Sequence, residues 1–335
     1  MQKITPLISL IMPVYNHEKF VERAILSIIH QTYSNWELIV IDDGSTDGSK
    51  NIIENFNDDR IKYFYQKNQG VLNLAKTINK GLALTRGEFV TMVPSDDTWP
   101  AERFSIQVPE MLDEKIVISF GKMNLIDQYD NKIGFSNPRN ESRFLENKPI
   151  GKIFNDLLIN NFIGEPTILI RKKYLIELGG YQQPDGMLAE DYPTTLYLAC
   201  KGNFKFIDHT LANYRFHSSQ MTRLHVVDMV EKDKEFILNF FNSIPQNIKN
   251  FINFDSKKLG QKWDEKISRS HFSLARRQIL IGERKKARKE FYISFKRSKN
   301  LLIKLASLIG ILHTYLGLNI EWMTLFSSSS IKLRK

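Results

Sequence analysis

The chain has 335 residues, of which 42% are hydrophobic, 25% are charged and 11% are aromatic. This composition is typical of a folded globular protein and excludes a largely disordered chain. The one cysteine, Cys200, excludes an internal disulfide and a C-x-x-C metal or redox site. The first residues contain neither a long apolar segment nor a small-residue cleavage site, so we expect no export signal and a cytoplasmic protein.

The net charge of +10 is concentrated toward the end of the chain. Between Lys257 and Lys304 there are 16 Lys and Arg residues and 4 Asp and Glu residues, so the rest of the chain has a charge of −2. A segment this basic is expected to bind an anionic surface. The two candidates are the inner leaflet of a membrane and a nucleic acid.

Apolar runs of strand length alternate with helical periodicity from residue 7 to about residue 120, which predicts βαβ units and a mainly parallel sheet. The expected strands are 7–12, 36–41, 61–65 and 88–93. The expected helices are 20–29, 48–56, 71–82 and one that begins at Pro100, with Thr98 or Trp99 near its cap.

The pattern from residue 121 to residue 165 is mixed and polar, with an exposed loop expected at 137–141 and no site assigned. Further on we expect a strand at 167–170, a short helix to Leu178, a helix at 191–200, and a strand pair at 204–207 and 211–216. The sequence after residue 226 is helical. We therefore predict an α/β domain at 1–225, with halves at 1–120 and 121–225, and a basic helical appendage at 226–335.

Two acidic motifs follow predicted strands directly, at the carboxyl ends where open α/β sheets bind ligands. The motif at 42–47 is either a turn with a helix cap or a site that binds a base or ribose through Asp42. The motif Ser95-Asp96-Asp97 is either an acidic flank of the next helix or a cation site. Adjacent carboxylates repel each other, and hard divalent cations compensate for that repulsion.

A third acidic pair, Glu190-Asp191, opens a predicted helix. It is either a helix cap or a source of a general base, because a carboxylate held near a hydroxyl can take its proton. His217 follows the last predicted strand. As a lone histidine it is either structural or a metal ligand, and imidazole suits Mn²⁺ better than Mg²⁺.

The motifs taken together resemble family-2 glycosyltransferases of the GT-A fold over roughly residues 7–220. They are ISLIMPVYN at 8–16, QTY at 31–33, ELIVIDDGSTD at 37–47, NQG at 68–70, NKG at 79–81, RGEF at 86–89, SDD at 95–97, ED at 190–191 and YRFH at 214–217. The resemblance implies a GT-A Rossmann-like, mainly parallel sheet flanked by helices.

The resemblance also implies a site for a nucleoside diphosphate sugar. The residues that it assigns to the donor are Pro13, Val14, Tyr15, Asp42, Asn68, Gly70, Ser95 and Asp96. Asp96 matches the last acid of the family's D-x-D motif and would hold Mn²⁺ or Mg²⁺ with His217. Pro94 occupies the place of the first acid and cannot be a ligand, so the metal would depend on Asp96 and on the diphosphate itself.

The resemblance further implies an inverting hexosyltransferase in which Asp191 is the general base. We expect a UDP-sugar as donor, a glycan or lipid-linked saccharide as acceptor, and a role in capsule or lipopolysaccharide synthesis. One alternative is a nucleotide-sugar-binding protein without activity. The other is a basic nucleic-acid-binding protein, but no recognition motif supports it and we expect no nucleic acid partner.

The basic segment ends in an apolar stretch, Leu301 to Leu318, which is interrupted by Lys304 and His313. It is shorter than the roughly 20 residues needed to span a bilayer. We expect residues 257–318 to attach peripherally to the anionic inner face of the cell membrane. The alternative is a helical cap on the catalytic domain whose Lys and Arg side chains are only solvated.

Overall fold

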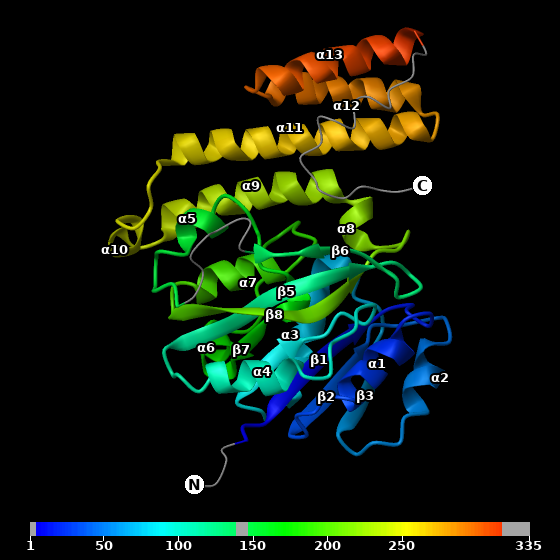
Figure 1. The fold of residues 1–335 in the computed structure, drawn as a ribbon, viewed down its shortest axis with the longest axis vertical. Coiled ribbons are helices and arrows are strands. Elements are labelled where there is room, and N and C mark those ends of the chain that lie inside the picture. Colours follow the sequence, from blue (N-terminus) through cyan, green and yellow to red (C-terminus); the bar gives the residue numbers. More distant parts are fainter. Residues whose placement is uncertain (1–4, 139–146, 317–335) are drawn as a thin grey trace. The chain divides into compact units, whose positions relative to one another are not determined.

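The computed structural model describes residues 5–138 and 147–316 (Figure 1). Residues 139–141 of the expected loop lie outside these ranges. So do residues 317 and 318 of the expected membrane segment and the end of the appendage. The chain forms two compact units. The first contains the described residues up to Ser218 together with Pro245–Asn253, and the second contains Ser219–Ile244 and the described residues from Phe254 onward.

The first unit is built on a sheet whose described strands run in the order β3-β2-β1-β4-β7-β5-β6, with β8 paired to β5. Four pairs of strands are parallel, namely β1–β2, β1–β4, β2–β3 and β5–β8. β7 is antiparallel to β4 and to β5, and β6 is antiparallel to β5. The strands are β1 (Ile8–Val14), β2 (Trp36–Asp42), β3 (Ile61–Tyr65), β4 (Phe89–Met92), β5 (Ile116–Ile126), β6 (Lys132–Ser136), β7 (Leu169–Arg171) and β8 (Asn203–Arg215). The predicted α/β class with a mainly parallel sheet flanked by helices is confirmed.

The central strands are apolar on both faces because helices cover both sides of the sheet. β2 is buried along its whole length, and α1 contributes Val21, Ala24, Ile25 and Ile28 to the same core. The helices of this unit are α1 (Val21–Ile29), α2 (Ser49–Glu54), α3 (Leu74–Leu84), α4 (Arg103–Glu110), α5 (Phe154–Leu157), α6 (Lys172–Glu177), α7 (Asp191–Leu198) and α10 (Gln246–Lys249). The parallel order β3-β2-β1-β4 brings the carboxyl ends of these strands to one edge.

Three local predictions were wrong. The expected strand pair at 204–207 and 211–216 is one strand, β8, whose register against β5 shifts beside Gly121 and Lys122. The bulge resembles a turn in sequence because it interrupts the alternation of side chains. The helix expected at Pro100 begins at Arg103, after a turn. At 165–167 a 3-10 turn replaces the start of the expected strand.

The segment at 121–165, to which no element was assigned, contains most of β5, all of β6, and α5. β6 exposes Lys132, Ile133 and Phe135, and Phe135 is 61% exposed. Ile133 and Phe135 alternate with Lys132, Gly134 and Ser136, but the strand has only five residues, so its pattern is too short to stand out in a polar segment.

The second unit is helical throughout the residues that the structure describes. Its elements are α8 (Met221–Leu224), α9 (Val226–Ser243), α11 (Ser256–Leu280), α12 (Arg284–Arg297) and α13 (Leu301–Leu316). α11 packs against α9 and α12, and α12 packs against α13 around Phe272, Ala275, Ala287, Phe291 and Ala306. None of the described helices is both long and apolar enough to cross a bilayer.

Candidate active site

The loops after β1 and β2 are tied together at the carboxyl edge of the sheet. The side-chain oxygen of Asn16 accepts a hydrogen bond from the backbone N–H of Thr46 at 2.8 Å, and the hydroxyl of Ser45 accepts one from the N–H of Asn16 at 3.0 Å. Asn16 adopts a φ of 54°, which turns the chain sharply after Tyr15. Tyr15 is half exposed at this edge, whereas the predicted ligand Val14 is buried in the core.

Asp42, the last residue of β2, is fully buried, and both of its carboxylate oxygens accept hydrogen bonds. One accepts from the N–H of Ser45 at 2.7 Å and the other from the hydroxyl of Tyr63 at 2.7 Å. Burial and the neighbouring Asp42 raise the pKa of Tyr63 well above its ordinary value, so Tyr63 remains a donor. The sequence reasoning missed Tyr63, because only the β2–β3 register brings it beside Asp42.

The predicted residues Asn68 and Gly70 lie next to the turn that follows β2. The amide of Asn68 donates to the carbonyl of Asp43 at 2.8 Å, and the carboxylate of Asp43 accepts from the backbone N–H of Gln69 at 3.1 Å. Gly44 has a φ of +82°, and a Cβ there would meet the backbone nitrogen of Asn68 at 2.6 Å. Asp43 therefore joins the two loops, and Gly44 is the residue that permits their close approach.

Ser95 and Asp96 contact two histidines from distant parts of the chain. Nδ1 of His17 lies 2.6 Å from Oγ of Ser95, and Nε2 of His217 lies 2.9 Å from a carboxylate oxygen of Asp96. The two imidazole rings are perpendicular, with centroids 6.2 Å apart, and Phe20 packs against His217. The structure thus unites the predicted residues Ser95, Asp96 and His217, and adds His17, which the sequence reasoning missed.

The two adjacent carboxylates differ in environment. Burial acts to raise the pKa of Asp96, but the hydrogen bond to His217 and the nearby His17 hold this pKa below its ordinary value. The pKa of Asp97 is raised well above its ordinary value by burial and then by the charge of Asp96. One oxygen of Asp97 accepts from the backbone N–H of Arg215 at 2.7 Å. Asp96 is therefore the charged member of the pair.

The structure also weighs against Asp96 and Asp97 as a helix flank. α4 begins at Arg103, several residues further along the chain, and Glu102 is its N-cap. The helix dipole acts only within the first turn, so it does not stabilise these acids. Their position is set instead by Arg215, whose Nε donates to the carbonyl of Asp96 at 2.6 Å.

Asp191 opens α7 and follows the buried Glu190. Glu190 is the N-cap of α7, yet its side chain makes no capping hydrogen bond. The amide of Asn161 donates to Asp191 at 3.2 Å, but burial nevertheless raises the pKa of Asp191 above its ordinary value. Burial and then the neighbouring Asp191 raise the pKa of Glu190 to about 8. Asp191 is partly accessible, so it can meet a ligand.

Glu165 connects the two acidic motifs. It is partly buried, and desolvation raises its pKa well above the ordinary value, with further increases from Glu190, Asp191 and Asp97. Asp97 in the loop after β4 and Glu190 and Asp191 at the start of α7 therefore all lie close enough to affect the pKa of Glu165. Burial and neighbouring acids disfavour the charged form of such a carboxyl group, so Asp96 and the partly accessible Asp191 are the better candidates for chemistry.

We expect Glu190→Gln to flatten the dependence of stability on pH. In the wild type the raised pKa of Glu190 makes folding most favourable below the unfolded value near 4.5, and stability falls as pH rises toward about 8. The variant avoids that loss, so above pH 8 it gains roughly 1–4 kcal/mol relative to the wild type. Urea denaturation at pH 5 and pH 9 measures the difference. The exposed Asp185→Asn is the control, and parallel losses in wild type and Glu190→Gln would contradict the expectation.

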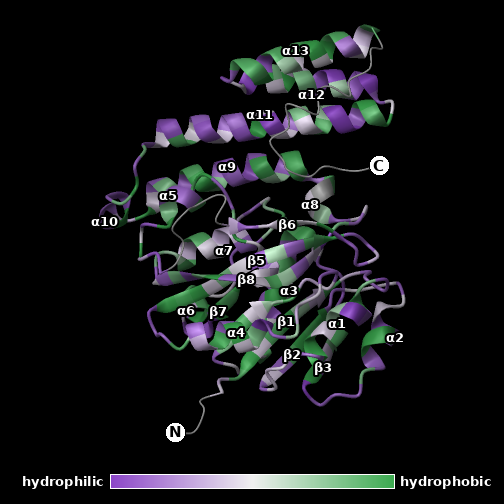
Figure 2. Cartoon of the chain, viewed as in Figure 1, coloured by the Kyte–Doolittle hydropathy of each residue, from purple (hydrophilic) through white to green (hydrophobic). Residues whose placement is uncertain are grey.

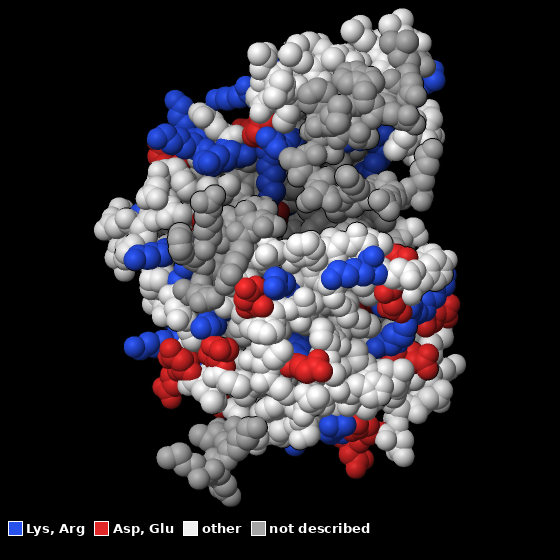
Figure 3. All heavy atoms as spheres, viewed as in Figure 1, with Lys and Arg blue, Asp and Glu red and all other residues white. Residues whose placement is uncertain are grey.

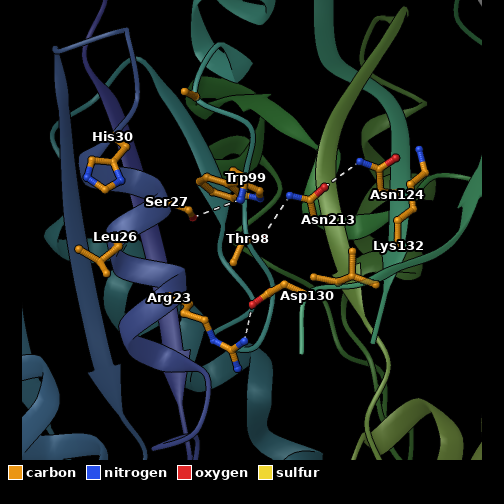
Figure 4. A pocket seen from close by; sticks show the side chains of 12 residues that line it. Arg23, Leu26, Ser27, His30, Thr98, Trp99, Asn124, Asp130, Lys132 and Asn213 are labelled. Atoms are coloured by element: carbon orange, nitrogen blue, oxygen red, sulfur yellow. Dashed lines mark hydrogen bonds and ion pairs between the residues drawn. The ribbon is translucent and has the colours of Figure 1, made fainter. Parts of the chain in front are cut away.

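A hollow of 470 Å³ lies beside the acidic motif, between α1, β5, β6 and β8 (Figure 4). Asn213 of β8 donates to Oγ1 of Thr98 at 3.2 Å and receives a hydrogen bond from Asn124 at 2.9 Å. Arg23 pairs with Asp130 across its mouth. None of the residues predicted to bind the donor lines this hollow.

The comparisons with known proteins agree with this geometry. The sequence profile of "Glycosyl transferase family 2" matches residues 9–179. TuaG of Bacillus subtilis, named for teichuronic acid biosynthesis, is 29% identical over 221 residues, which cover 65% of this chain and 82% of TuaG. WfgD of Escherichia coli, named as a UDP-Glc:alpha-D-GlcNAc-diphosphoundecaprenol beta-1,3-glucosyltransferase, is 33% identical over 169 residues, 50% of this chain and 62% of WfgD. Two Rickettsia relatives are covered over only 35% of their length.

Solved structures share the fold. Residues 1–349 of Staphylococcus aureus TarS in complex with UDP-GlcNAc align with a TM-score of 0.58 at 18% identity, over 92% of this chain and 89% of that chain. The mannosyltransferase PcManGT of Pyrobaculum calidifontis, solved with GDP-Man and Mn²⁺, aligns with a TM-score of 0.58 at 16% identity, over 96% and 83%. The profile match includes β1 through α6 and the motifs of Asp42 and Asp96. The chain therefore belongs to glycosyl transferase family 2 and is a glycosyltransferase.

Proposed function

We propose that this enzyme is an inverting, metal-assisted glycosyltransferase. It moves a sugar from a nucleoside diphosphate sugar, a UDP-sugar in the first instance, to a hydroxyl of a glycan or lipid-linked acceptor in surface polysaccharide synthesis. The observation that carries the proposal is the pair of carboxylates with opposite environments. Asp96 is held charged beside two imidazoles, while Asp191 is partly accessible and has a raised pKa.

The donor's nucleoside is proposed to bind over the carboxyl ends of β1 and β2. Tyr15 offers an exposed aromatic face there, and the loops bearing Asp42 and Asn68 are already joined by hydrogen bonds. Loops that are already ordered in this way lose little conformational entropy when they bind the donor. A UDP-sugar donor is supported by two similar proteins, because WfgD is named for UDP-Glc and TarS was solved in complex with UDP-GlcNAc.

The side chains around Asp96 suit Mn²⁺ or Mg²⁺. The available donors are a carboxylate from Asp96 and an imidazole from His217, a set that Mn²⁺ accepts. Among the residues that the structure describes, no three His, Cys, Asp or Glu side chains are gathered as a metal cage. A cation would therefore take its other ligands from the donor's diphosphate and water. When bound, it would offset the charge that develops on the departing diphosphate.

Asp191 is proposed to act as the general base. It takes the proton of the acceptor hydroxyl as that oxygen forms a bond to the anomeric carbon of the donor sugar. The bond between the anomeric carbon and the diphosphate breaks with its electron pair, and a nucleoside diphosphate leaves. A single displacement inverts the anomeric centre. The raised pKa of Asp191 makes it a better proton acceptor than an ordinary aspartate.

His17 is proposed to position the metal-binding loop through Ser95. We expect His17→Ala to lower kcat/KM by roughly tenfold and to raise the Mn²⁺ concentration needed for half-maximal activity, because the 2.6 Å contact with Ser95 is lost. His17→Asn, which can keep a hydrogen bond to Ser95, should restore part of the loss. The exposed His30→Ala is the matched control. An unchanged Mn²⁺ requirement in His17→Ala would contradict this role.

The enzyme is proposed to work at the cytoplasmic face of an anionic membrane, where a lipid-linked acceptor would be available. The basic segment from Lys257 onward supports this placement. The activity is tested by screening UDP-, GDP- and TDP-sugars for release of the nucleoside diphosphate with Mn²⁺, with Mg²⁺ and with a chelator. Turnover of one donor that stops with the chelator supports the proposal. No turnover of any donor, with or without acceptor glycans, would contradict it.

A further inference from the structure

The outer face of α13 is entirely apolar. All exposed side chains of this helix belong to Leu, Ile or Tyr, whereas Lys304 is half-buried and His313 is buried. The exposed fractions are Leu301 69%, Leu302 60%, Leu305 48%, Leu308 40%, Ile309 38%, Leu312 56%, Tyr315 63% and Leu316 67%. In Figure 2, α13 is green along most of its length, and α11 is mostly purple. A continuous apolar face of this size on one helix marks an interaction surface.

The inner face of α13 is fixed against α12, so the helix cannot rotate to bury its leucines. A Cβ added to Gly310 would lie 2.5 Å from the ring of Phe291, which shows how closely the two helices pack. Ser307 donates to the hydroxyl of Ser294 at 3.0 Å, deeper in the same interface. Both contacts place the small side chains of α13 inward. The leucine face is therefore the outward face of a docked helix.

Cations of α12 and α13 border this face. The guanidinium of Arg288 stacks 3.4 Å from the ring centroid of Tyr315, and the ammonium of Lys304 lies 5.4 Å from that of Phe295. These contacts form a rim where α12 meets α13. Beyond the rim, α12 carries a stripe of exposed residues at a spacing of three and four. The stripe consists of Lys285, Lys289, Tyr292 and Lys296.

We propose that the outer face of α13 enters the headgroup region of an anionic membrane and lies parallel to its surface, with the Lys and Arg side chains of α12 on the lipid phosphates. The 16 residues of α13 span about 24 Å, less than the roughly 30 Å of a hydrocarbon core, so the helix lies in the interface. From 284 to 299, α12 and the residues after it contain eight Lys and Arg and one acid, Glu290. The inference deepens the proposed function, because a lipid-linked acceptor is presented at a membrane.

A second copy of the chain fits this face less well. Leu301, Leu305, Leu308, Leu312 and Tyr315 follow a heptad spacing, but coiled coils place charged residues beside such a seam. α13 has no acid and only one Lys. Figure 3 shows a group of Lys and Arg side chains over the part of α11 that is open to view. An uncharged apolar face beside a stripe of cations is better suited to an anionic membrane than to the same face of a second copy.

Vesicle flotation of the full chain tests the proposal. The wild type should float with vesicles that contain phosphatidylglycerol and phosphatidylcholine. It should stay unbound when the vesicles contain phosphatidylcholine alone. Leu305→Glu/Leu312→Glu should bind the anionic vesicles at least tenfold more weakly, and Lys285→Gln/Lys289→Gln should weaken binding and reduce its salt dependence. Ile176→Glu, which adds a charge at a residue 53% exposed on α6, should bind as the wild type does.

Each outcome decides between lipid and other occupants. Equal flotation of the wild type and Leu305→Glu/Leu312→Glu would overturn the proposal. So would a wild-type dimer, seen by light scattering, that becomes a monomer in this variant without vesicles. Release of the nucleoside diphosphate from the donor in solution should be unchanged in the variant, which separates a failure of membrane binding from a failure of the proposed activity.

Discussion

Replacing Asp191 with asparagine is expected to lower the rate of sugar transfer by about 10²- to 10⁴-fold, the usual contribution of a general base. Asparagine keeps the shape of the side chain and can still contact Asn161, but it cannot take a proton. The nucleotide binds elsewhere in the proposed arrangement, so its affinity should stay within about twofold. Transfer is measured as nucleoside diphosphate released in the presence of an acceptor.

Asn161→Ala and Glu190→Gln serve as comparisons for Asp191→Asn. Asn161→Ala removes a hydrogen bond that lowers the pKa of Asp191, so the transfer rate should reach its plateau at a higher pH. Glu190→Gln removes a neighbouring acid without removing the proposed base, so it should retain much more activity than Asp191→Asn. A fully active Asp191→Asn would disprove the assignment of the base.

Replacing Asp96 with asparagine is expected to lower donor turnover by about 10²- to 10³-fold, the scale of losing one group that stabilises charge in the transition state. The side chain keeps its size, but it loses the charge that would balance a cation beside His217. Raising the Mn²⁺ concentration should restore part of the activity. Thermal melting of both proteins checks that the fold survives.

Asp97→Asn is the matched control for Asp96→Asn. Asp97 is buried with a raised pKa, and an amide oxygen can replace its carboxyl as acceptor of the Arg215 N–H. We therefore expect Asp97→Asn to retain most of its activity and its metal dependence. If the two variants lost activity equally, the distinction between the two acids would be wrong, and both would have to be treated as one site.

The first half of the fold follows from local sequence. Residues 36–41 are a run of apolar and β-branched side chains, and α1 has its apolar residues at helical spacing, so strand and helix were both predictable. Because parallel strands end at one edge, Asp42 and Asp96 could be placed there from sequence. The strand β6 was missed because its alternation covers only five residues, and the bulge in β8 could not be predicted because a shifted register interrupts the pattern.

The partners of the site residues depend on tertiary contacts. His17 follows β1, and nothing in its neighbourhood indicates that it reaches Ser95, 78 positions along the chain. Tyr63 was assigned only as part of a strand, and its bond to Asp42 depends on the register between β2 and β3. Glu165 ends the segment to which no site was assigned, and only its neighbours Glu190, Asp191 and Asp97 in the fold distinguish it. Local motifs predict candidate ligands, but not the residues that hold them.

The most direct test of the account is calorimetric titration of UDP into the wild type, Asp96→Asn and Asp191→Asn, each with Mn²⁺ and with a chelator. We expect Mn²⁺ to tighten UDP binding at least tenfold in the wild type and in Asp191→Asn, and to have little effect in Asp96→Asn. If UDP bound all three proteins equally with and without Mn²⁺, Asp96 would have no role in holding a metal against the diphosphate.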